Sequence, residues 1–256
     1  MSLLSIENLT HYFGGLRAVY DFSLELEPGE LVAIIGPNGA GKTTVFNLIT
    51  GVYRPTEGQI VFRDKNLIGL QTHEIISRGI ARTFQTIRLF KELTVLDNVR
   101  IAHYTRAGYT PWEAILRLPR FTRQEEQVRQ EALELLNIFG MADLAEVTSK
   151  NLPYGQQRRL EIARALATRP TLLLLDEPAA GMNPAEVEHL MDTILWIRRD
   201  FSLTILLIEH QMRVVMGIAE RIKVLDFGET IAEGTPEEIQ NHPKVIEAYL
   251  GEEVVV

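Results

Sequence analysis

The sequence of 256 residues contains no cysteine. This absence excludes disulfide bonds and zinc sites built on cysteine, and it suits a reducing compartment. Long apolar runs are also missing: uninterrupted runs reach only about five residues, whereas a membrane-spanning helix needs about twenty. The opening residues show no basic segment followed by an apolar one, so we expect no signal peptide. Together these absences predict a soluble protein.

Basic residues are in the minority, because 26 Lys and Arg stand against 34 Asp and Glu and give a formal net charge of −8. A nucleic-acid-binding surface requires a basic face, so we expect no nucleic-acid partner, although a local basic patch can lie on an acidic protein. The hydrophobic share of 46% and the charged share of 23% are ordinary for a globular domain. The length allows one large α/β domain or two small ones.

Short apolar runs alternate with helical patterns along the chain. Strands are predicted at residues 22–26, 31–36, 59–62, 171–176, 203–209 and 221–227, and helices at residues 42–50, 124–139, 156–169 and 186–199. The continuous apolar runs are typical of buried parallel strands, whereas the alternating runs at 22–26 and 59–62 indicate half-exposed antiparallel strands. Because residues 95–169 are mostly helical in pattern, we expect a parallel α/β core interrupted by a helical insertion.

A glycine-rich segment, GPNGAGKTT, follows the predicted strand at 31–36 and precedes a predicted helix. It matches the phosphate-loop pattern G-x-x-x-x-G-K-[ST] through Thr43, in the structural context that this pattern requires. The glycines allow backbone N–H groups to surround phosphates, Lys42 would neutralise the β- and γ-phosphate oxygens, and the Thr43 hydroxyl would bind Mg²⁺. The residues expected to contact a nucleoside triphosphate are Gly36, Pro37, Asn38, Gly39, Ala40, Gly41, Lys42, Thr43 and Thr44.

Polar side chains follow three other strand-like runs. Asp176 and Glu177 end TLLLLDE, Gln85 ends IARTFQ, and His210 ends LTILLIEH. Ligands of open α/β sheets bind at the carboxyl ends of the strands, so one ligand could collect these side chains. Asp176 would hold Mg²⁺, Glu177 would accept a proton from the attacking water, and Gln85 would contact Mg²⁺ or that water.

His210 would donate a hydrogen bond to the γ-phosphate. Each residue alone has an ordinary alternative, since acids often end strands because they are solvated there, and a single histidine after a strand is more often structural. Their occurrence beside a phosphate loop favours the functional interpretation.

The order of these motifs, with LPYGQ at residues 152–156 between the phosphate loop and the acidic strand, resembles the ATP-binding cassette (ABC) family, the ATPase subunits of ABC transporters. The resemblance spans essentially the whole chain. It implies a single ABC ATPase domain over residues 1–256 with the P-loop NTPase fold. That fold has a RecA-like core with a mixed or parallel sheet, an antiparallel β subdomain, and a helical subdomain at roughly 91–168 inserted between 1–90 and 169–256.

The resemblance also implies ATP and Mg²⁺ as cofactors and a second cassette as partner. In the family, the signature LSGGQ points a helix start at the ATP held by the other subunit, so Gly155 and Gln156 are expected to contact that ATP. Phe13 matches the family position whose aromatic ring stacks on adenine. The alternative is that Phe13 is an ordinary core or edge residue. In the family, the signature of each subunit completes the ATP site formed by the phosphate loop of the other subunit. The two subunits are therefore expected to meet head to tail, with two ATP molecules between them.

Three positions depart from the family pattern. Pro153 replaces the signature serine, Tyr154 replaces a glycine, and Asn183 stands where aspartate is usual. Proline has neither a hydroxyl nor an N–H group, so fewer donors remain at the signature. We hypothesise that the ATP site completed by this signature is weaker than the other site of an asymmetric dimer; neutral variation within a subgroup is the alternative.

Several segments are typical of one subgroup: RTFQTIRLFKELTVLDNV, LPYGQQRRLEIARAL, DEPAAGMNP and the ending AYLGE. On these segments, the chain most resembles the LivG-type ATP-binding proteins of bacterial branched-chain amino acid importers. This subgroup implies a LivF-like partner cassette or a second copy, two membrane permeases, an indirectly attached periplasmic binding protein, and a peripheral place on the cytoplasmic face of the inner membrane. Importers of urea, amides or other amino acids, lipid or lipopolysaccharide exporters, and soluble ABC ATPases remain alternatives. The helical insertion and the Gln85 loop would grip a permease, while Arg82, Arg88 and Lys91 are equally consistent with solvated surface charge.

Overall fold

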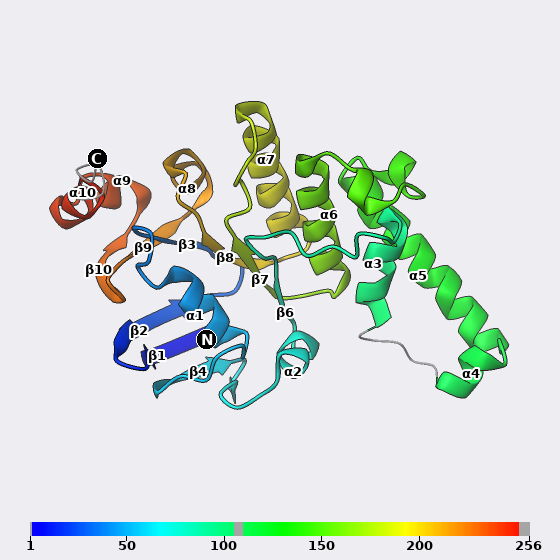
Figure 1. Cartoon of the computed structure of the whole chain (residues 1–256), viewed down its shortest axis with the longest axis horizontal. Coiled ribbons are helices and arrows are strands. Elements are labelled where there is room, and N and C mark those ends of the chain that lie inside the picture. The colour runs from blue at the N-terminus through cyan, green and yellow to red at the C-terminus, as the bar shows by residue number, and fades with distance from the viewer. Residues whose placement is uncertain (1, 105–109, 251–256) are drawn as a thin grey trace. The chain divides into compact units, whose positions relative to one another are not determined.

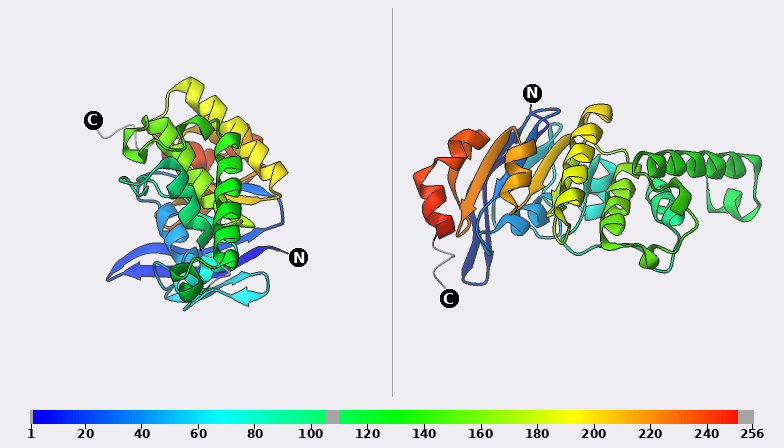
Figure 2. Two further views of the ribbon diagram at one scale, coloured as in Figure 1. Left: turned by 90° about the vertical axis from the view of Figure 1, so that its right-hand side faces the viewer. Right: turned by 90° about the horizontal axis from the view of Figure 1, so that it is seen from above.

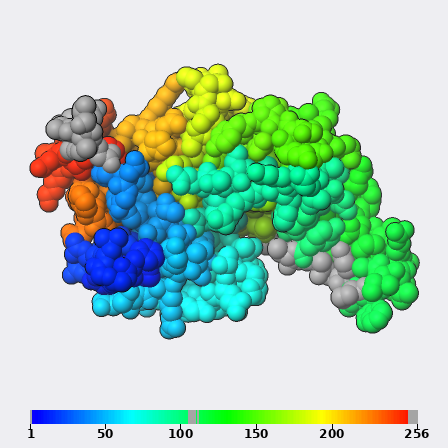
Figure 3. All heavy atoms as spheres, viewed as in Figure 1, coloured from blue at the N-terminus to red at the C-terminus, as the bar shows by residue number. Residues whose placement is uncertain are grey.

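The computed structural model describes residues 2–104 and 110–250. The chain forms two compact units. One consists of Met1–Arg82 and Thr171–Val256 and is called the core unit here; the other, Thr83–Pro170, is called the helical unit. In the space-filling view, the early (blue) and late (orange and red) parts of the core unit form one continuous mass (Figure 3).

The core unit contains all the strands of the described residues. They are β1 (Leu4–Phe13), β2 (Leu16–Leu26), β3 (Leu31–Ile35), β4 (Glu57–Phe62), β5 (Lys65–Asn66), β6 (Ile80–Arg82), β7 (Leu172–Asp176), β8 (Thr204–Ile208), β9 (Arg221–Asp226) and β10 (Glu229–Gly234). The helices of this unit are α1 (Lys42–Ile49), α2 (Thr72–Ser77), α7 (Pro184–Asp200), α8 (Met212–Ile218), α9 (Pro236–Gln240) and α10 (Pro243–Leu250).

These strands form two sheets. The larger has the order β10-β9-β3-β8-β7-β6, and its strands are parallel except for β10, which is antiparallel to β9. The smaller has the order β2-β1-β4-β5 and is antiparallel. Every predicted strand is present, and the antiparallel assignment of residues 22–26 and 59–62 is confirmed. The strands β1, β5 and β10 were not predicted. The strand-like run at 80–85 forms a strand only over β6, so the expectation that Gln85 ends a strand is wrong.

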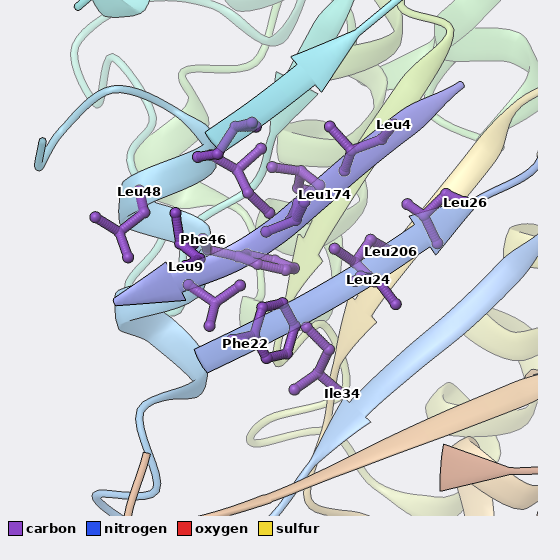
Figure 4. Close-up of a cluster of buried hydrophobic side chains, with 14 of the residues drawn as sticks. Leu4, Leu9, Phe22, Leu24, Leu26, Ile34, Phe46, Leu48, Leu174 and Leu206 are labelled. Carbon is purple, nitrogen blue, oxygen red and sulfur yellow. The ribbon is translucent and has the colours of Figure 1, made fainter. Parts of the chain in front are cut away.

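One hydrophobic cluster joins the two sheets through α1, and the close-up in Figure 4 shows its side chains. Its labelled members come from both sheets and from the helix: Leu4, Leu9, Phe22, Leu24, Leu26, Ile34, Phe46, Leu48, Leu174 and Leu206. Full burial of each such side chain contributes about 1.5–3 kcal/mol. The helices α7 and α8 cover the other face of the larger sheet. This packing fixes the start of α1, and with it the loop that precedes the helix.

The helical unit consists of α3 (Val95–His103), α4 (Pro111–Ile115), α5 (Pro119–Ile138) and α6 (Tyr154–Ala167), with short 3₁₀ turns η2 (Ala142–Leu144) and η3 (Ser149–Asn151). The helices α3, α5 and α6 bury apolar side chains that include Val99, Leu136 and Ile162. The helices predicted at 124–139 and 156–169 correspond to α5 and α6, and Figure 2 shows the length of α5 from two further sides. None of the described helices combines the length and the apolar character that a membrane span requires.

Candidate functional site

The glycine-rich loop lies between β3 and α1, where its glycines adopt backbone conformations that other residues rarely adopt. The φ angles of Gly36, Gly39 and Gly41 are 147°, 80° and 99°. A Cβ atom on Gly36 would lie 2.0 Å from the carbonyl oxygen of Leu225, and one on Gly41 would lie 2.4 Å from that of Ala18. Glycine is therefore required here both by the φ angles and by the close approach of neighbouring backbone.

Lys42 is the first residue of α1, and its side chain is buried inside this loop. Its Nζ atom donates hydrogen bonds to the carbonyl oxygens of Gly36 at 2.5 Å and Pro37 at 2.7 Å. The N-cap residue, Gly41, provides no side-chain cap, and the first turn of the helix has no acidic residue. The partial positive charge of the helix start is thus reinforced by an ammonium group, which is the arrangement that favours a bound phosphate. The Thr43 side chain, one residue further along, is exposed.

Asp176, the last residue of β7, forms a buried ion pair with Arg82, the last residue of β6. The distance from Arg82 Nη2 to Asp176 Oδ2 is 2.7 Å, and the two side chains are 6% and 1% exposed. Arg82 Nη1 also donates to Asn47 Oδ1 of α1 at 2.7 Å. The interpretation of Arg82 as solvated surface charge is therefore wrong: this residue connects the end of β7 to the helix that follows the glycine-rich loop.

Glu177 and His210 follow the neighbouring parallel strands β7 and β8 and lie close together. The distance from His210 Nδ1 to Glu177 Oε2 is 3.8 Å, with His210 half exposed and Glu177 largely buried. The expectation that these strand ends meet at one sheet edge is confirmed for this pair. Glu177 has a φ of 46° and donates its backbone N–H to Ile208 at 2.8 Å. A left-handed, non-glycine residue carries strain that the surrounding structure must hold, and such residues cluster at functional sites.

Glu209 follows β8 and holds neighbouring segments together, a role that the sequence alone did not indicate. Its side chain is fully buried, and Oε1 accepts the N–H of Ala179 at 2.9 Å, while Oε2 accepts those of His210 at 2.9 Å and Gln211 at 3.1 Å. Glu209 therefore ties the segment after β7 to the segment after β8. The sequence feature that could have indicated this role is an acid directly after the apolar run LTILLI. A carboxylate that is buried at the end of such a strand needs several hydrogen-bond donors.

The substitution Glu209→Gln is expected to lower the free energy of unfolding by about 1–3 kcal/mol. Glutamine offers one acceptor oxygen and an NH₂ donor, so the amide group would face N–H donors of the backbone and leave at least one of them unpaired. Urea denaturation measures the change. Glu188→Gln is the control, because Glu188 is 63% exposed and pairs with exposed Arg213. Equal stability of the two variants would show that Glu209 does not hold these segments together.

Phe13 lies at the end of β1 in a small aromatic cluster. Its ring meets those of His11 and Tyr53 edge-on, with centroid distances of 4.7 Å and 5.1 Å, and His11 and Tyr53 stack at 5.7 Å. Because Phe13 is 42% exposed, it is not a core residue. The Phe13 ring is therefore partly accessible to a further flat ring.

Gln85 lies in the helical unit, in a loop whose backbone is held by α6. Arg158 donates to the carbonyl oxygens of Phe84 at 2.5 Å and Gln85 at 2.7 Å, and it pairs with Glu161 at 2.8 Å. The side chains of Arg158 and Glu161 are 0% and 2% exposed. Glu161 Oε1 in turn accepts the N–H of Arg88 at 3.2 Å. A fully buried ion pair thus positions the loop that carries Gln85.

The departures at the signature have structural consequences at the start of α6. Pro153 is the N-cap and provides no side-chain cap. The hydroxyl of Tyr154 accepts a hydrogen bond from Arg158 Nη2 at 3.3 Å, which a glycine could not do. Gly155 is buried and Gln156 partly buried, both in the helical unit. The tyrosine therefore connects the signature to the ion pair that holds the Gln85 loop.

Asn183 performs the capping that aspartate would perform. Its Oδ1 atom accepts the N–H groups of Ala185 and Glu186, both at 3.0 Å, at the start of α7. Asparagine and aspartate are about equally favourable N-caps, so this departure leaves the local structure supported.

Comparison with known proteins identifies the family. A model described as ABC transporter matches residues 19–180, and one described as branched-chain amino acid ATP-binding cassette transporter matches residues 229–255. The high-affinity branched-chain amino acid transport ATP-binding protein LivG of Escherichia coli (strain K12) is 49% identical over 98% of each chain. The corresponding protein BraF of Pseudomonas aeruginosa (strain PAO1) is 45% identical, also over 98% of each chain.

Solved structures agree with this result. The ADP conformation of MJ1267, an ATP-binding cassette of an ABC transporter, has a TM-score of 0.85 at 33% identity and covers 98% of this chain and 99% of its own. A dimeric post-hydrolysis state of the cassette MJ0796, bound to ADP and Pi, has a TM-score of 0.76 at 28% identity, with 91% and 98% covered. The chain therefore belongs to the ABC transporter family: it is a nucleotide-binding cassette with the α/β P-loop NTPase fold and an ATPase coupled to transport.

Proposed function

We propose that this chain powers a membrane importer for branched-chain amino acids. The observation that carries the proposal is the 49% identity with LivG over 98% of both chains. The match of residues 229–255 to the branched-chain amino acid cassette model supports the same cargo. Urea, amides and other amino acids are the alternative cargoes, and lipid or lipopolysaccharide export is a more distant alternative.

The triphosphate of ATP would lie in the loop of Gly36 to Thr44, with Lys42 beside the β- and γ-phosphates and Phe13 against the adenine. Stacking of a base on an aromatic ring is worth about 1–3 kcal/mol. In a second subunit, the same ATP would meet the helix start at Gly155 and Gln156. The buried position of Lys42 and the uncapped start of α1 support this placement.

Mg²⁺ fits the donors that this chain provides. The hydroxyl of Thr43, the carboxylate of Asp176 and the side-chain amide of Gln85 are all oxygen donors, which Mg²⁺ prefers. Among the described residues, no group of three or more His, Cys, Asp or Glu side chains could form a complete metal site. That agrees with Mg²⁺, which is usually held by few protein groups together with substrate phosphates. The ion would neutralise charge on the β- and γ-phosphate oxygens.

In hydrolysis, Glu177 would accept the proton of the attacking water and His210 would donate a hydrogen bond to the γ-phosphate. The 3.8 Å between His210 Nδ1 and Glu177 Oε2 supports a common site, because both side chains could reach one phosphate and its attacking water. The buried carboxylate of Glu209 would position both residues through the backbone, as a positioning residue that touches no substrate.

The proposed assembly contains a LivF-like second cassette or a second copy of this chain, two integral membrane permeases, and indirectly a periplasmic binding protein. The dimeric MJ0796 cassette supports the pairing of cassettes. The chain would then be a peripheral protein on the cytoplasmic face of the inner membrane, with no nucleic-acid partner. ATP binding would close the two cassettes, and hydrolysis with product release would reopen them.

Co-purification from cells at the native expression level tests the transporter assignment. We expect a second cassette and two permeases to accompany the chain, and the complex in lipid vesicles to accumulate leucine, isoleucine or valine when ATP is supplied. Accumulation of urea or an amide instead would reassign the cargo while retaining the transporter. Recovery of nucleic acid or ribosomal proteins without a permease would refute the transporter role.

The substitution Lys42→Ala is expected to weaken ATP binding about 10- to 100-fold. The loss follows from one hydrogen bond between charged groups, worth about 1.5–3 kcal/mol, and each 1.4 kcal/mol is a tenfold change in affinity. Titration with a fluorescent ATP analogue measures the dissociation constant. Lys65→Ala, which removes an exposed lysine of β5, is the control. Unchanged affinity in Lys42→Ala would show that this lysine does not bind phosphate.

The substitution Pro153→Ser tests whether the signature departure weakens one ATP site. The serine hydroxyl would donate a hydrogen bond to the γ-phosphate of the ATP bound by the second subunit. It would also cap the start of α6. We expect the ATPase rate of the assembled complex to rise about 10- to 100-fold, which corresponds to one hydrogen bond to a charged group. Steady-state phosphate release measures the rate. Absence of any gain would favour neutral variation of the subgroup.

A further inference from the structure

Helix α4 and the turn after it expose an apolar surface within the helical unit. The exposed fractions are 72% for Trp112, 68% for Ile115, 66% for Leu116 and 40% for Leu118. We call residues 112–118 the α4 patch; α4 lies beside the N-terminal end of α5 (Figures 1 and 2). Single exposed apolar residues are ordinary, but four large ones within seven residues concentrate apolar area at one place. Such concentrations mark interaction surfaces.

The charged residue of α4 is directed toward its own unit rather than toward solvent. The Glu113 side chain is 19% exposed, accepts the N–H of Thr110 at 2.6 Å, and lies 3.5 Å from Arg120 of α5. The hydrogen bonds from Thr110 hold the pKa of the Glu113 carboxyl below its usual value. A surface helix normally turns its apolar face inward and its charges outward. Here the order is reversed, so the α4 patch adds little to the packing of the helical unit.

Three arginines lie within the α4 patch or shortly after it in the sequence. Arg117, Arg120 and Arg123 are all exposed, and Glu113 is the single acid in the stretch TPWEAILRLPRFTR. This local excess is opposite in sign to the formal net charge of −8 carried by the whole chain. A surface complementary to the α4 patch and these arginines would therefore offer both apolar and anionic groups.

We propose that the α4 patch docks on the surface of a membrane that contains anionic phospholipids. Tryptophan is enriched at the boundary between headgroups and acyl chains, where Trp112 would lie with Ile115 and Leu116. Arg117 and Arg123 would bind lipid phosphates, because guanidinium groups pair with phosphate oxygens. An apolar groove of another protein would account for the apolar residues but not for the arginines around them. This contact goes beyond the proposed transport function and does not depend on the cargo.

Vesicle binding by the full chain tests the proposal, and tryptophan fluorescence can report it directly. The sequence has two tryptophans, so Trp196→Phe leaves Trp112 as the single reporter. With vesicles of phosphatidylglycerol and phosphatidylethanolamine, we expect a blue shift of the emission and quenching by brominated acyl chains. Phosphatidylcholine vesicles should give much weaker binding. Arg117→Gln with Arg123→Gln should weaken binding roughly fivefold for each arginine, with less effect at high salt.

Two further variants test whether vesicle binding depends on the α4 patch or on exposed apolar side chains in general. Ile115→Ser with Leu116→Ser should abolish the blue shift. Phe227→Ser removes an apolar side chain that is 81% exposed in the turn between β9 and β10, and it should leave vesicle binding unchanged. Circular dichroism verifies that each variant is folded. An emission that does not respond to anionic vesicles, or an equal loss in Phe227→Ser, would overturn the proposal. Protection of Trp112 by detergent-solubilised permeases alone would assign the α4 patch to a protein partner instead, whereas the transport function would stand in each case.

Discussion

Replacement of Glu177 by glutamine is expected to lower the rate of ATP hydrolysis by about 10²–10⁴-fold, the usual contribution of a positioned general base. The amide keeps the size of the side chain and its place beside His210, 3.8 Å away, but it cannot accept the proton of water. ATP binding should persist, so paired cassettes with intact ATP should accumulate. Phosphate release measures the rate, and size-exclusion chromatography with ATP measures the pairing.

The control for this prediction is Glu188→Gln, which makes the same chemical change at a residue 63% exposed on α7. Its hydrolysis rate should remain within about twofold of the unmodified chain, because exposed ion pairs contribute little. Hydrolysis by Glu177→Gln at the unmodified rate would exclude Glu177 as the base. A loss of ATP binding in this variant would indicate a structural role for the residue, since its φ of 46° makes its backbone sensitive to change.

Replacement of Arg158 by methionine is expected to lower the free energy of unfolding by about 3–5 kcal/mol, the usual cost of leaving a buried charge without its partner. Glu161 would remain buried, and the carbonyl oxygens of Phe84 and Gln85 would lose donors at 2.5 Å and 2.7 Å. At temperatures where the variant stays folded, the ATPase rate should also fall, because the Gln85 loop is no longer held on α6. Chemical denaturation and phosphate release measure the two effects.

Two companion variants distinguish the buried pair from ordinary surface charge. Lys150→Met breaks an exposed pair with Glu92, whose side chains are 48% and 77% exposed, and it should change stability by less than about 1 kcal/mol. Arg158→Met combined with Glu161→Leu removes both charges and should recover part of the loss, since replacing a whole buried pair by apolar groups is often neutral. A loss in Arg158→Met no larger than that in Lys150→Met would contradict the prediction.

The buried parallel strands and the glycine-rich loop were predictable because their signals are local: continuous apolar runs, and glycines at fixed spacing before a lysine. Strand β1 was not predicted because its pairing with β2 shifts register between Ile6 and Leu9 and again between Leu9 and His11. Those irregularities, with Asn8 at a φ of 48°, disturb the alternation of buried and exposed residues by which a strand is detected.

The residues that hold the site together were less visible in the sequence than the residues proposed to contact ATP. Arg82 and Asp176 are far apart along the chain, and nothing near either residue indicates that the two form a buried ion pair. Glu209 likewise owes its role to Ala179, thirty positions away in sequence. Tyr154 looked like the simple loss of a glycine, and only the fold reveals its hydrogen bond to Arg158. Such contacts depend on tertiary structure, which a single sequence does not display.

The position of the helical unit in the strand order has a consequence for how this architecture could change. Residues 83–170 leave the end of β6 and return at the start of β7, which are adjacent parallel strands of one sheet. Parallel neighbours always need a crossover connection of a dozen residues or more, and the helical unit is that connection, enlarged. The hydrogen bonds between β6 and β7, in which Ile80 pairs with Leu172, do not depend on the residues that connect the two strands. The sheet therefore does not constrain the length of the helical unit. Insertions or exchanges of whole helices within this crossover leave the register of the ATPase sheet unchanged.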